Sequence, residues 1–212
     1  RFMGRQTTKK RIMDVAEQLF ATRGVSGTSI RNITSRAKVN LAAVHYHFGS
    51  KESVLEAVVS RRLVPLTAER SALLDEYERQ SEGGAVELPK IIEALVGPAL
   101  RLSRSSEKGG EHFMRLLGRL VMEPDAKIQR ILTDHFRLSL EKFKPPLEKA
   151  LPHLKPADFF WRVHFLVGAM VHTMADSERI QIVSGGICNP DDTEGTVKRL
   201  VSFISAGMEA DT

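Results

Sequence analysis

The chain has 212 residues, 42% of them apolar, and a formal net charge of +5. These values exclude a wholly disordered chain, and they allow one large domain or a small domain joined to a larger one. Through Arg62 there are 12 lysines and arginines against 4 aspartates and glutamates, a net charge of +8, whereas the remaining residues carry 19 against 22, a net charge of −3. The basic excess of the first third predicts a polyanionic partner for it.

The number of cysteines and the length of the apolar runs restrict the cellular compartment that we expect for the protein. Cys188 is the single cysteine, which excludes an intramolecular disulfide and favours a reducing environment. No apolar run approaches the roughly 20 residues of a transmembrane helix, and no signal peptide opens the sequence. We therefore expect a cytoplasmic protein with no membrane partner.

The first ten residues are polar and basic, with cationic side chains at Arg1, Arg5, Lys9 and Lys10. Two interpretations remain open for them, an arm along the backbone or minor groove of DNA and a frayed terminus. From Thr8 to Thr22, apolar residues recur at helical spacing and predict a helix that ends before Gly24.

The stretch between residues 28 and 52 contains two short helical patterns separated by a tight turn. The apolar residues of the first pattern share one face: Ile30, Ile33 and Ala37. Thr28 or Ser29 can cap its start. The residues of the second pattern that we expect in the core are Leu41, Val44 and Phe48. Two short helices joined in this way predict a helix-turn-helix.

The opposite face of the second helix is unusual for a solvated surface. Its residues are Ala42, Ala43, Tyr46 and His47, with Asn40 and His45 on the flanks. The face carries no acid and no long charged side chain. Small residues allow a close approach and the polar flanks can donate hydrogen bonds, which suits a helix that enters the major groove of DNA.

The segment from Lys10 to Val59 resembles the DNA-binding domain of the TetR family of bacterial repressors. The matching pieces are Arg11-Ile12, Ala16–Phe20, Arg23-Gly24, Thr28–Arg31 and His45–Glu52. The wording VNLAAVHYHFGSKE further resembles the PsrA-type branch, whose members answer to fatty acids. The resemblance implies a DNA-binding domain over residues 1–52 and a ligand-binding and dimerisation domain over residues 53–212.

The expected DNA contacts fall into two kinds. We expect Thr28 and Lys51 to bind phosphates from helix N-termini, and His45, Tyr46 and His47 match family positions that contact the DNA backbone. The residues expected to read bases are Asn40, Ala42 and Ala43.

Two positions depart from the family pattern. Lys38 replaces the usual turn glycine, which predicts a left-handed lysine at a cost of about 1 kcal/mol, and its ammonium can reach a phosphate. Leu41 stands where many relatives carry lysine, which removes one expected contact with the groove.

The remainder is helical, with no alternating strand pattern. Ser50 caps a helix that Pro65 breaks or kinks. The further helices are predicted at Leu66–Gln80, Leu88–Ser103 with a kink at Pro98, Glu111–Met122, Ala126–Phe143, a short stretch to Leu151, Pro156–Ala175 and Thr193–Glu209. Loops are expected at 81–84, 105–110, 123–125, Pro145-Pro146 and 184–192. The fold class is therefore all-α, a three-helix helix-turn-helix domain followed by a helical C-terminal domain.

The stretch Pro156–Ala175 is apolar nearly all round, so every side of that helix must be covered. In the TetR family the last two main helices form a four-helix bundle across a dimer axis. The resemblance thus implies a homodimer, and the expected interface residues are Trp161, His164, Gly168, Val171, Val197, Val201 and Ile204.

The family resemblance also implies a ligand cavity in the C-terminal domain. Each of the residues expected to line it could equally be an ordinary residue of the hydrophobic core. The apolar residues expected to line it are Phe113, Met114, Leu117, Val121, Phe136, Leu140, Phe165 and Met170. Such a lining suits a long acyl chain, and the groups available for a polar head are Arg115, Arg119, His164 and His172.

Enzyme and metal motifs do not occur in the sequence. The spacing of His112, His135, His164 and His172 matches no metal site, and no nucleophile motif or phosphate loop is present. We expect no cofactor. The sequence predicts a dimeric repressor that binds a palindromic operator and is released by an apolar effector, such as a long-chain fatty acid or acyl-CoA. A nonspecific architectural DNA-binding protein, an efflux regulator that answers to another hydrophobic effector and a helical enzyme are the alternatives.

Overall fold

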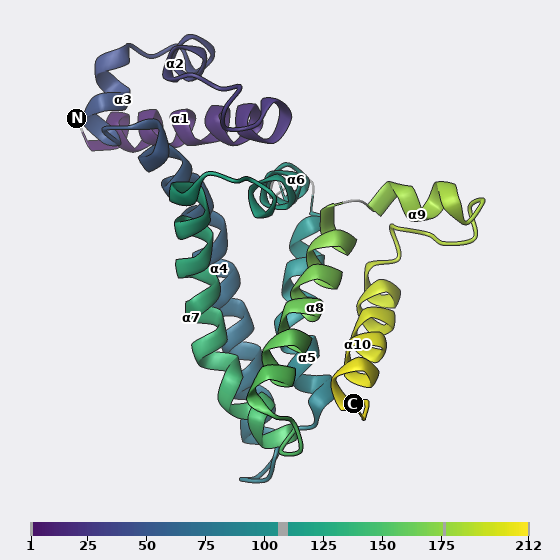
Figure 1. Ribbon diagram of the computed structural model, residues 1–212. Coiled ribbons are helices and arrows are strands. Elements are labelled where there is room, and N and C mark those ends of the chain that lie inside the picture. The colour runs from purple at the N-terminus through teal and green to yellow at the C-terminus, as the bar shows by residue number, and fades with distance from the viewer. Residues whose placement is uncertain (1, 106–109, 176, 212) are drawn as a thin grey trace.

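The computed structural model describes residues 2–105, 110–175 and 177–211, and all the regular secondary structure in these ranges is helical (Figure 1). The helices are α1 (Phe2–Arg23), α2 (Ile30–Ala37), α3 (Leu41–His47), α4 (Lys51–Gln80), α5 (Leu88–Ser103), α6 (Gly110–Val121), α7 (Ala126–Ala150), α8 (Pro156–Ala175), α9 (Ser177–Val183) and α10 (Thr193–Glu209). The predicted all-α fold class is confirmed.

Local sequence accounts for the ends of the first helices. Gly24, with φ of +76°, follows the last residue of α1. The Ser29 hydroxyl accepts from the Asn32 N–H while the Asn32 side chain accepts from the Ser29 N–H, which makes a capping box at the start of α2. Ser50 caps α4 in the same way by accepting from the Ser53 N–H. Lys38 has φ of 52° and ψ of 48°, so the predicted left-handed lysine is confirmed.

The N-terminal prediction was wrong over residues 2–10, because α1 begins at Phe2 and these residues extend it. They form neither a separate arm nor a frayed end, and Arg1 lies outside the described residues. The buried residues Ile12, Ala16, Leu19 and Phe20 give α1 the apolar face expected for it.

The loop predicted at Pro145 and Pro146 was wrong, since α7 continues through both prolines. At Pro65 a break or a kink was expected; α4 continues through it, which excludes the break, and the kink stays a prediction. A proline removes one backbone hydrogen bond, but packing on both sides can hold the helix together. In α7 the buried pair Phe143 and Leu147 spans the prolines on a single face. The short helix α9 had not been predicted, and the 184–192 loop follows it.

The helix α4 connects the two parts of the molecule. Its first half packs on α1, and its second half lies beside α7 and α5 (Figure 1). The boundary predicted at residue 52 falls in the first turn of α4, so no flexible linker separates the domains. The helix α6 contacts both α1 and α8, which gives a second connection between the helix-turn-helix and the C-terminal helices.

The C-terminal helices share one core, in which α5 packs against α10, α8 and α6. Arg162 on α8 is buried and donates to the carbonyls of Met208 and Ala210, both at 2.5 Å. These carbonyls belong to the end of α10, where backbone acceptors lack helical partners. Arg162 therefore fixes the end of α10 against α8.

Candidate nucleic-acid interface

The helix α3 is anchored by one side chain and exposes most of the rest. Val44 is fully buried and Phe48 is partly buried against the core, as predicted. Leu41, expected in the core, is instead 45% exposed. The helix has only seven residues and contacts the protein through its Val44 side, so a residue in its first turn extends past its neighbours. The solvent face thus includes an apolar side chain at position 41.

The predicted reading residues stand on that open face. Asn40 and Ala42 are exposed, and Ala43 is half-buried. The Asn40 side-chain oxygen accepts from the Ala43 N–H at 2.8 Å and caps α3. Its amide NH2 group points away from this bond and is the part of the side chain that suits an acceptor on a base edge.

Three aromatic rings continue this surface toward the end of α3. The His45 Nδ1 lies 3.1 Å from the Gly49 carbonyl, so Nδ1 donates to this carbonyl when it carries the proton, and Nε2 is then an acceptor. Tyr46 is 67% exposed, and its ring meets that of His47 edge-on at 5.2 Å. The described surface of α3 therefore combines small residues with polar rings.

Thr28 and Lys51 were both expected to bind phosphates from helix N-termini, and the structure places them differently. Thr28 is 1% exposed, its hydroxyl donates to the Gly24 carbonyl at 2.8 Å and its N–H donates to Val25 at 3.2 Å. Its donors are thus used inside the fold, and a phosphate contact by Thr28 does not fit this structure. Lys51 donates to the Val25 carbonyl at 3.0 Å, which leaves two ammonium hydrogens for an outside acceptor.

Arg11 was not singled out from the sequence, yet it stabilises the turn between α2 and α3. Its Nη2 donates to the carbonyls of Ala37 at 2.7 Å and Lys38 at 2.9 Å. The Lys38 side chain is exposed at the same turn. In the sequence, Arg11 gave no signal beyond its match to the family pattern together with Ile12.

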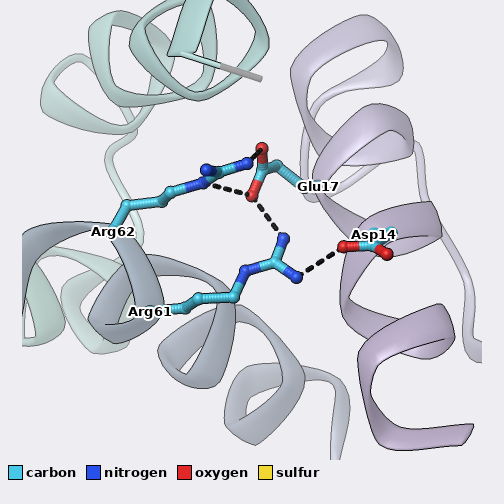
Figure 2. A network of polar contacts seen from close by, with 4 residues as sticks. All are labelled: Asp14, Glu17, Arg61 and Arg62. Atoms are coloured by element: carbon cyan, nitrogen blue, oxygen red, sulfur yellow. Dashed lines mark hydrogen bonds and ion pairs between the residues drawn. The ribbon is translucent and has the colours of Figure 1, made fainter. Parts of the chain in front are cut away.

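A network of ion pairs connects α1 with α4 (Figure 2). Arg61 binds Asp14 at 2.5 Å and Glu17 at 2.6 Å, and Arg62 makes a two-pronged contact with Glu17 at 2.7 and 3.1 Å. Burial lowers the pKa of Arg61, but its hydrogen bonds to Glu17 and Asp14 outweigh that effect and leave the pKa above its ordinary value. Glu17 is 4% exposed, so α1 and the first half of α4 move together.

The predicted ligand residues differ in burial, and their role stays a prediction. Phe113, Met114, Leu117 and Met170 are packed in the core, whereas Val121, Phe136 and Leu140 are half-buried. Phe165 is 63% exposed on the outer face of α8, so it cannot line an internal cavity of the chain. The predicted head-group residues Arg115, Arg119, His164 and His172 are exposed.

Clefts occur elsewhere in the described part of the chain. One of about 760 Å³ lies between α8, α9 and α10 and includes His172 and Phe203. Another of about 720 Å³ lies at the junction of α1, α4 and α5 beside Arg61 and Arg62. Neither includes any of the eight predicted ligand residues.

The expected dimer residues divide into an exposed and a buried set. Trp161 is 61% exposed, and His164 and Gly168 are also exposed. Val201 is half-buried, and the residues that pack largely within the chain are Val171, Val197 and Ile204, at 9%, 2% and 5% exposure. Val197 and Ile204 therefore stabilise the chain's own core, because α10 turns them toward α5 and α8.

Sequence reasoning named Trp161 for the dimer interface but assigned Phe165 to the ligand cavity and missed Phe160 and Phe203. We define the α8–α10 face by Phe160, Trp161, Phe165 and Phe203, which are 50%, 61%, 63% and 71% exposed. The rings of Trp161 and Phe165 stack with centroids 5.9 Å apart. Four exposed aromatic residues on neighbouring helices exceed what an ordinary surface presents.

Within the described ranges, no three His, Cys, Asp or Glu residues are placed to hold a metal ion. No helix among the described residues has the length and apolarity needed to cross a membrane.

The short helix α3 has an open face of polar and small residues, follows a turn that Arg11 stabilises, and is joined by one long helix to a helical domain. This arrangement defines a DNA-binding transcriptional regulator. The family comparison agrees. Residues 12–58 match the family model for bacterial regulatory proteins of the tetR family, and residues 93–207 match the tetracyclin repressor-like C-terminal domain. The chain belongs to the TetR family, which consists of transcriptional regulators and not of enzymes.

Relatives by sequence fall into two groups. The HTH-type transcriptional repressor Rv3405c of Mycobacterium tuberculosis is 42% identical over 64 residues, which are 30% of this chain and 34% of that protein. Such matches span only about a third of the relative. The uncharacterized HTH-type transcriptional regulator YvkB of Bacillus subtilis is 31% identical over 173 residues, 82% of this chain and 86% of that protein.

Solved structures share the fold across both domains. A Clostridium perfringens protein described as a candidate fatty acid metabolism regulator has a TM-score of 0.64 at 18% identity and covers 94% of this chain and 96% of its own. HlyIIR, a hemolysin II transcriptional regulator, has a TM-score of 0.58 at 19% identity and covers 94% and 97%. At these identities the likeness establishes the fold alone.

Proposed function

We propose that this regulator is a repressor that binds a palindromic operator as a homodimer. The observation that carries the proposal is the face of α3, where Asn40, Ala42 and Tyr46 are exposed with no acid among them. Two such helices about 34 Å apart enter successive major grooves on one side of DNA. Lys38, His45, His47 and Lys51 supply backbone contacts, while Asn40, Ala42 and Ala43 read bases.

The α8–α10 face supports the dimer. Its four aromatic residues, together with His164 and Gly168, form the surface for a second copy of the chain. Aromatic side chains supply much of the energy of such interfaces when they become buried. The half-buried Val201 adds to it at the edge.

Release by a small molecule is the second part of the proposal. The effector is a hydrophobic molecule, and a long-chain fatty acid or its CoA ester is the class we favour. The PsrA-like wording of residues 39–52 and the description of the Clostridium perfringens neighbour support that class. The effector acts by preferring the conformation that does not fit DNA, and a hundredfold preference corresponds to about 2.7 kcal/mol.

The test is a titration of protein on DNA in which a random-sequence competitor is added. A fragment selected from random DNA should resist the competitor by at least about 10³-fold, the lower end of specific recognition. Equal displacement of the selected and random fragments would reject the repressor and favour a nonspecific architectural protein. A panel of fatty acids, acyl-CoAs and unrelated hydrophobic molecules then tests the release, and response to only the unrelated molecules would reject the lipid class.

A further inference from the structure

An arginine occupies a core position of α4. Leu63, Leu66 and Leu74 form the buried stripe of this part of the helix, and Arg70 lies in the same stripe with only 5% of its surface exposed. Glu69, its neighbour in sequence, is exposed. A cationic side chain here costs desolvation energy that a leucine would not.

The guanidinium of Arg70 has little to bind. Its Nη2 lies 3.4 Å from the sulfur of Met170 on α8, and its buried Nε has no hydrogen-bond partner. A thioether is a weak acceptor and carries no charge. Burial lowers the pKa of Arg70 to about 10, an effect that the charge of Glu69 offsets only in part, so the side chain remains a cation at neutral pH.

Other buried charges in the described chain have strong acceptors or donors. The Nε of Arg61 also has no hydrogen-bond partner, but the two Nη atoms of Arg61 bind Asp14 and Glu17. Arg162, 7% exposed, donates to two carbonyls at 2.5 Å, and Glu17, 4% exposed, accepts from Arg61 and Arg62. Arg70 is therefore not an instance of a general tolerance for unpaired ions. Since an unsatisfied buried group of this kind requires a cause, a missing anion is the simplest one.

We propose that Arg70 anchors the carboxylate of an apolar acid that binds between α4 and α8. The inference rests on the proposed ligand response and narrows it to a free acid. Arginine binds a carboxylate through two parallel hydrogen bonds, which a thioether sulfur does not reproduce. Met170 can rotate aside because its side chain is unbranched and flexible, and the acid then takes its place.

The surroundings of Arg70 define the rest of the ligand. Leu166 and Met174 lie one turn to either side of Met170 on the buried face of α8, and Leu66 and Leu74 flank Arg70 on α4. These residues suit an alkyl body rather than a second charge. A CoA ester has no carboxylate at the end of its acyl chain, and its phosphates belong to a bulky group unsuited to a buried position.

Calorimetric titration of the full-length protein tests the proposal. The probes are sodium salts of saturated acids of about 8 to 16 carbons, the matched primary alcohols and the matched acyl-CoAs. At least one acid should bind at least tenfold more tightly than its alcohol and its CoA ester. Arg70→Met should remove this preference, and Arg70→Lys should retain part of it. Arg79→Met, at an exposed position of α4, is the matched control.

The possible results of the titration distinguish a role of Arg70 in ligand binding from a loss of folding. Folding of Arg70→Met is checked by circular dichroism, and we expect it to melt no lower than the wild type because an unpaired buried cation is gone. Absence of acid binding to the wild type, equal binding of acid and alcohol, or an unchanged preference in Arg70→Met would overturn the proposal. Operator binding is measured in parallel without lipid, so its failure rejects the repressor while the titration still decides the role of Arg70.

Discussion

At the scale of single residues, the left-handed Lys38 is the clearest conflict between a side chain and its backbone. Its φ of 52° is a conformation that glycine adopts without strain, yet the lysine is held there by Arg11, which bonds the carbonyls of Ala37 and Lys38. Because the side chain is exposed beside α3, the strain accompanies a charge placed close to the DNA-facing surface.

Lys38→Gly should therefore raise the free energy of unfolding by about 0.5–1 kcal/mol, since the strained conformation becomes ordinary. Lys38→Ala removes the same charge but keeps the strain, so it should leave the stability nearly unchanged. Urea denaturation measures both variants. Equal stabilities for glycine and alanine would contradict this explanation, whatever the two variants do to DNA binding.

Asn40 caps α3 and is proposed to read bases, and substitution can separate the two roles. Asn40→Ala removes the cap of α3 and should cost about 1 kcal/mol in thermal or urea unfolding. Asn40→Ser keeps a capping oxygen, so it should be nearly as stable as the wild type while changing which operators are preferred, as measured by selection from random DNA. An unchanged preference in Asn40→Ser would remove Asn40 from the base-reading residues.

At the scale of elements, helix existence and type were largely predictable from the sequence, because the apolar period and the capping residues Ser29 and Ser50 are local signals. The prolines at 145 and 146 misled the prediction, since their cost is offset by packing that involves distant helices. The burial of Thr28 and the exposure of Leu41 and Phe165 depend on the neighbouring helices as well, so periodicity alone could not assign them.

The pairing of α1 with α4 is testable through Glu17. Glu17→Gln keeps the shape but removes the charge that holds Arg61 and Arg62, and we expect a loss of about 1.5–3 kcal/mol in the free energy of unfolding. Arg137→Gln, which breaks an exposed pair with Glu141 on α7, should cost less than about 0.5 kcal/mol. Comparable losses in the two variants would show that the buried ion pairs of Glu17 contribute no more to the free energy of unfolding than an exposed pair does.

At the scale of the whole molecule, the α8–α10 face is an apolar surface that the described part of the chain leaves open next to its own core. Family resemblance predicted the helices involved, while several of the side chains named for it proved to be internal. A sequence that is apolar on all sides of a helix indicates that every side is covered. It does not indicate which side packs against the same chain and which side packs against a partner.

Gly168→Glu tests the dimer. Nothing lies within 4 Å of the side-chain position at Gly168, so the chain itself can accept the substitution, whereas a dimer interface would bury an unpaired charge. We expect the dimer dissociation constant to rise at least about 100-fold in sedimentation experiments, with a parallel loss of operator affinity. Thr133→Glu on the exposed side of α7 is the control. An intact Gly168→Glu dimer would place the interface elsewhere.

The continuity of α4 has a mechanical consequence. Its thirty residues make a helix about 45 Å long that reaches from the helix-turn-helix into the C-terminal domain. Pro65 lacks the N–H that would bond to Arg61, so resistance to bending is weakest there. That weak point lies between Arg62, which is fastened to α1, and Arg70, which faces α8. A displacement of one or two ångströms on the Arg70 side would thus be converted into rotation about Pro65. The distance between two copies of α3 in a dimer would change by more than the displacement that caused it.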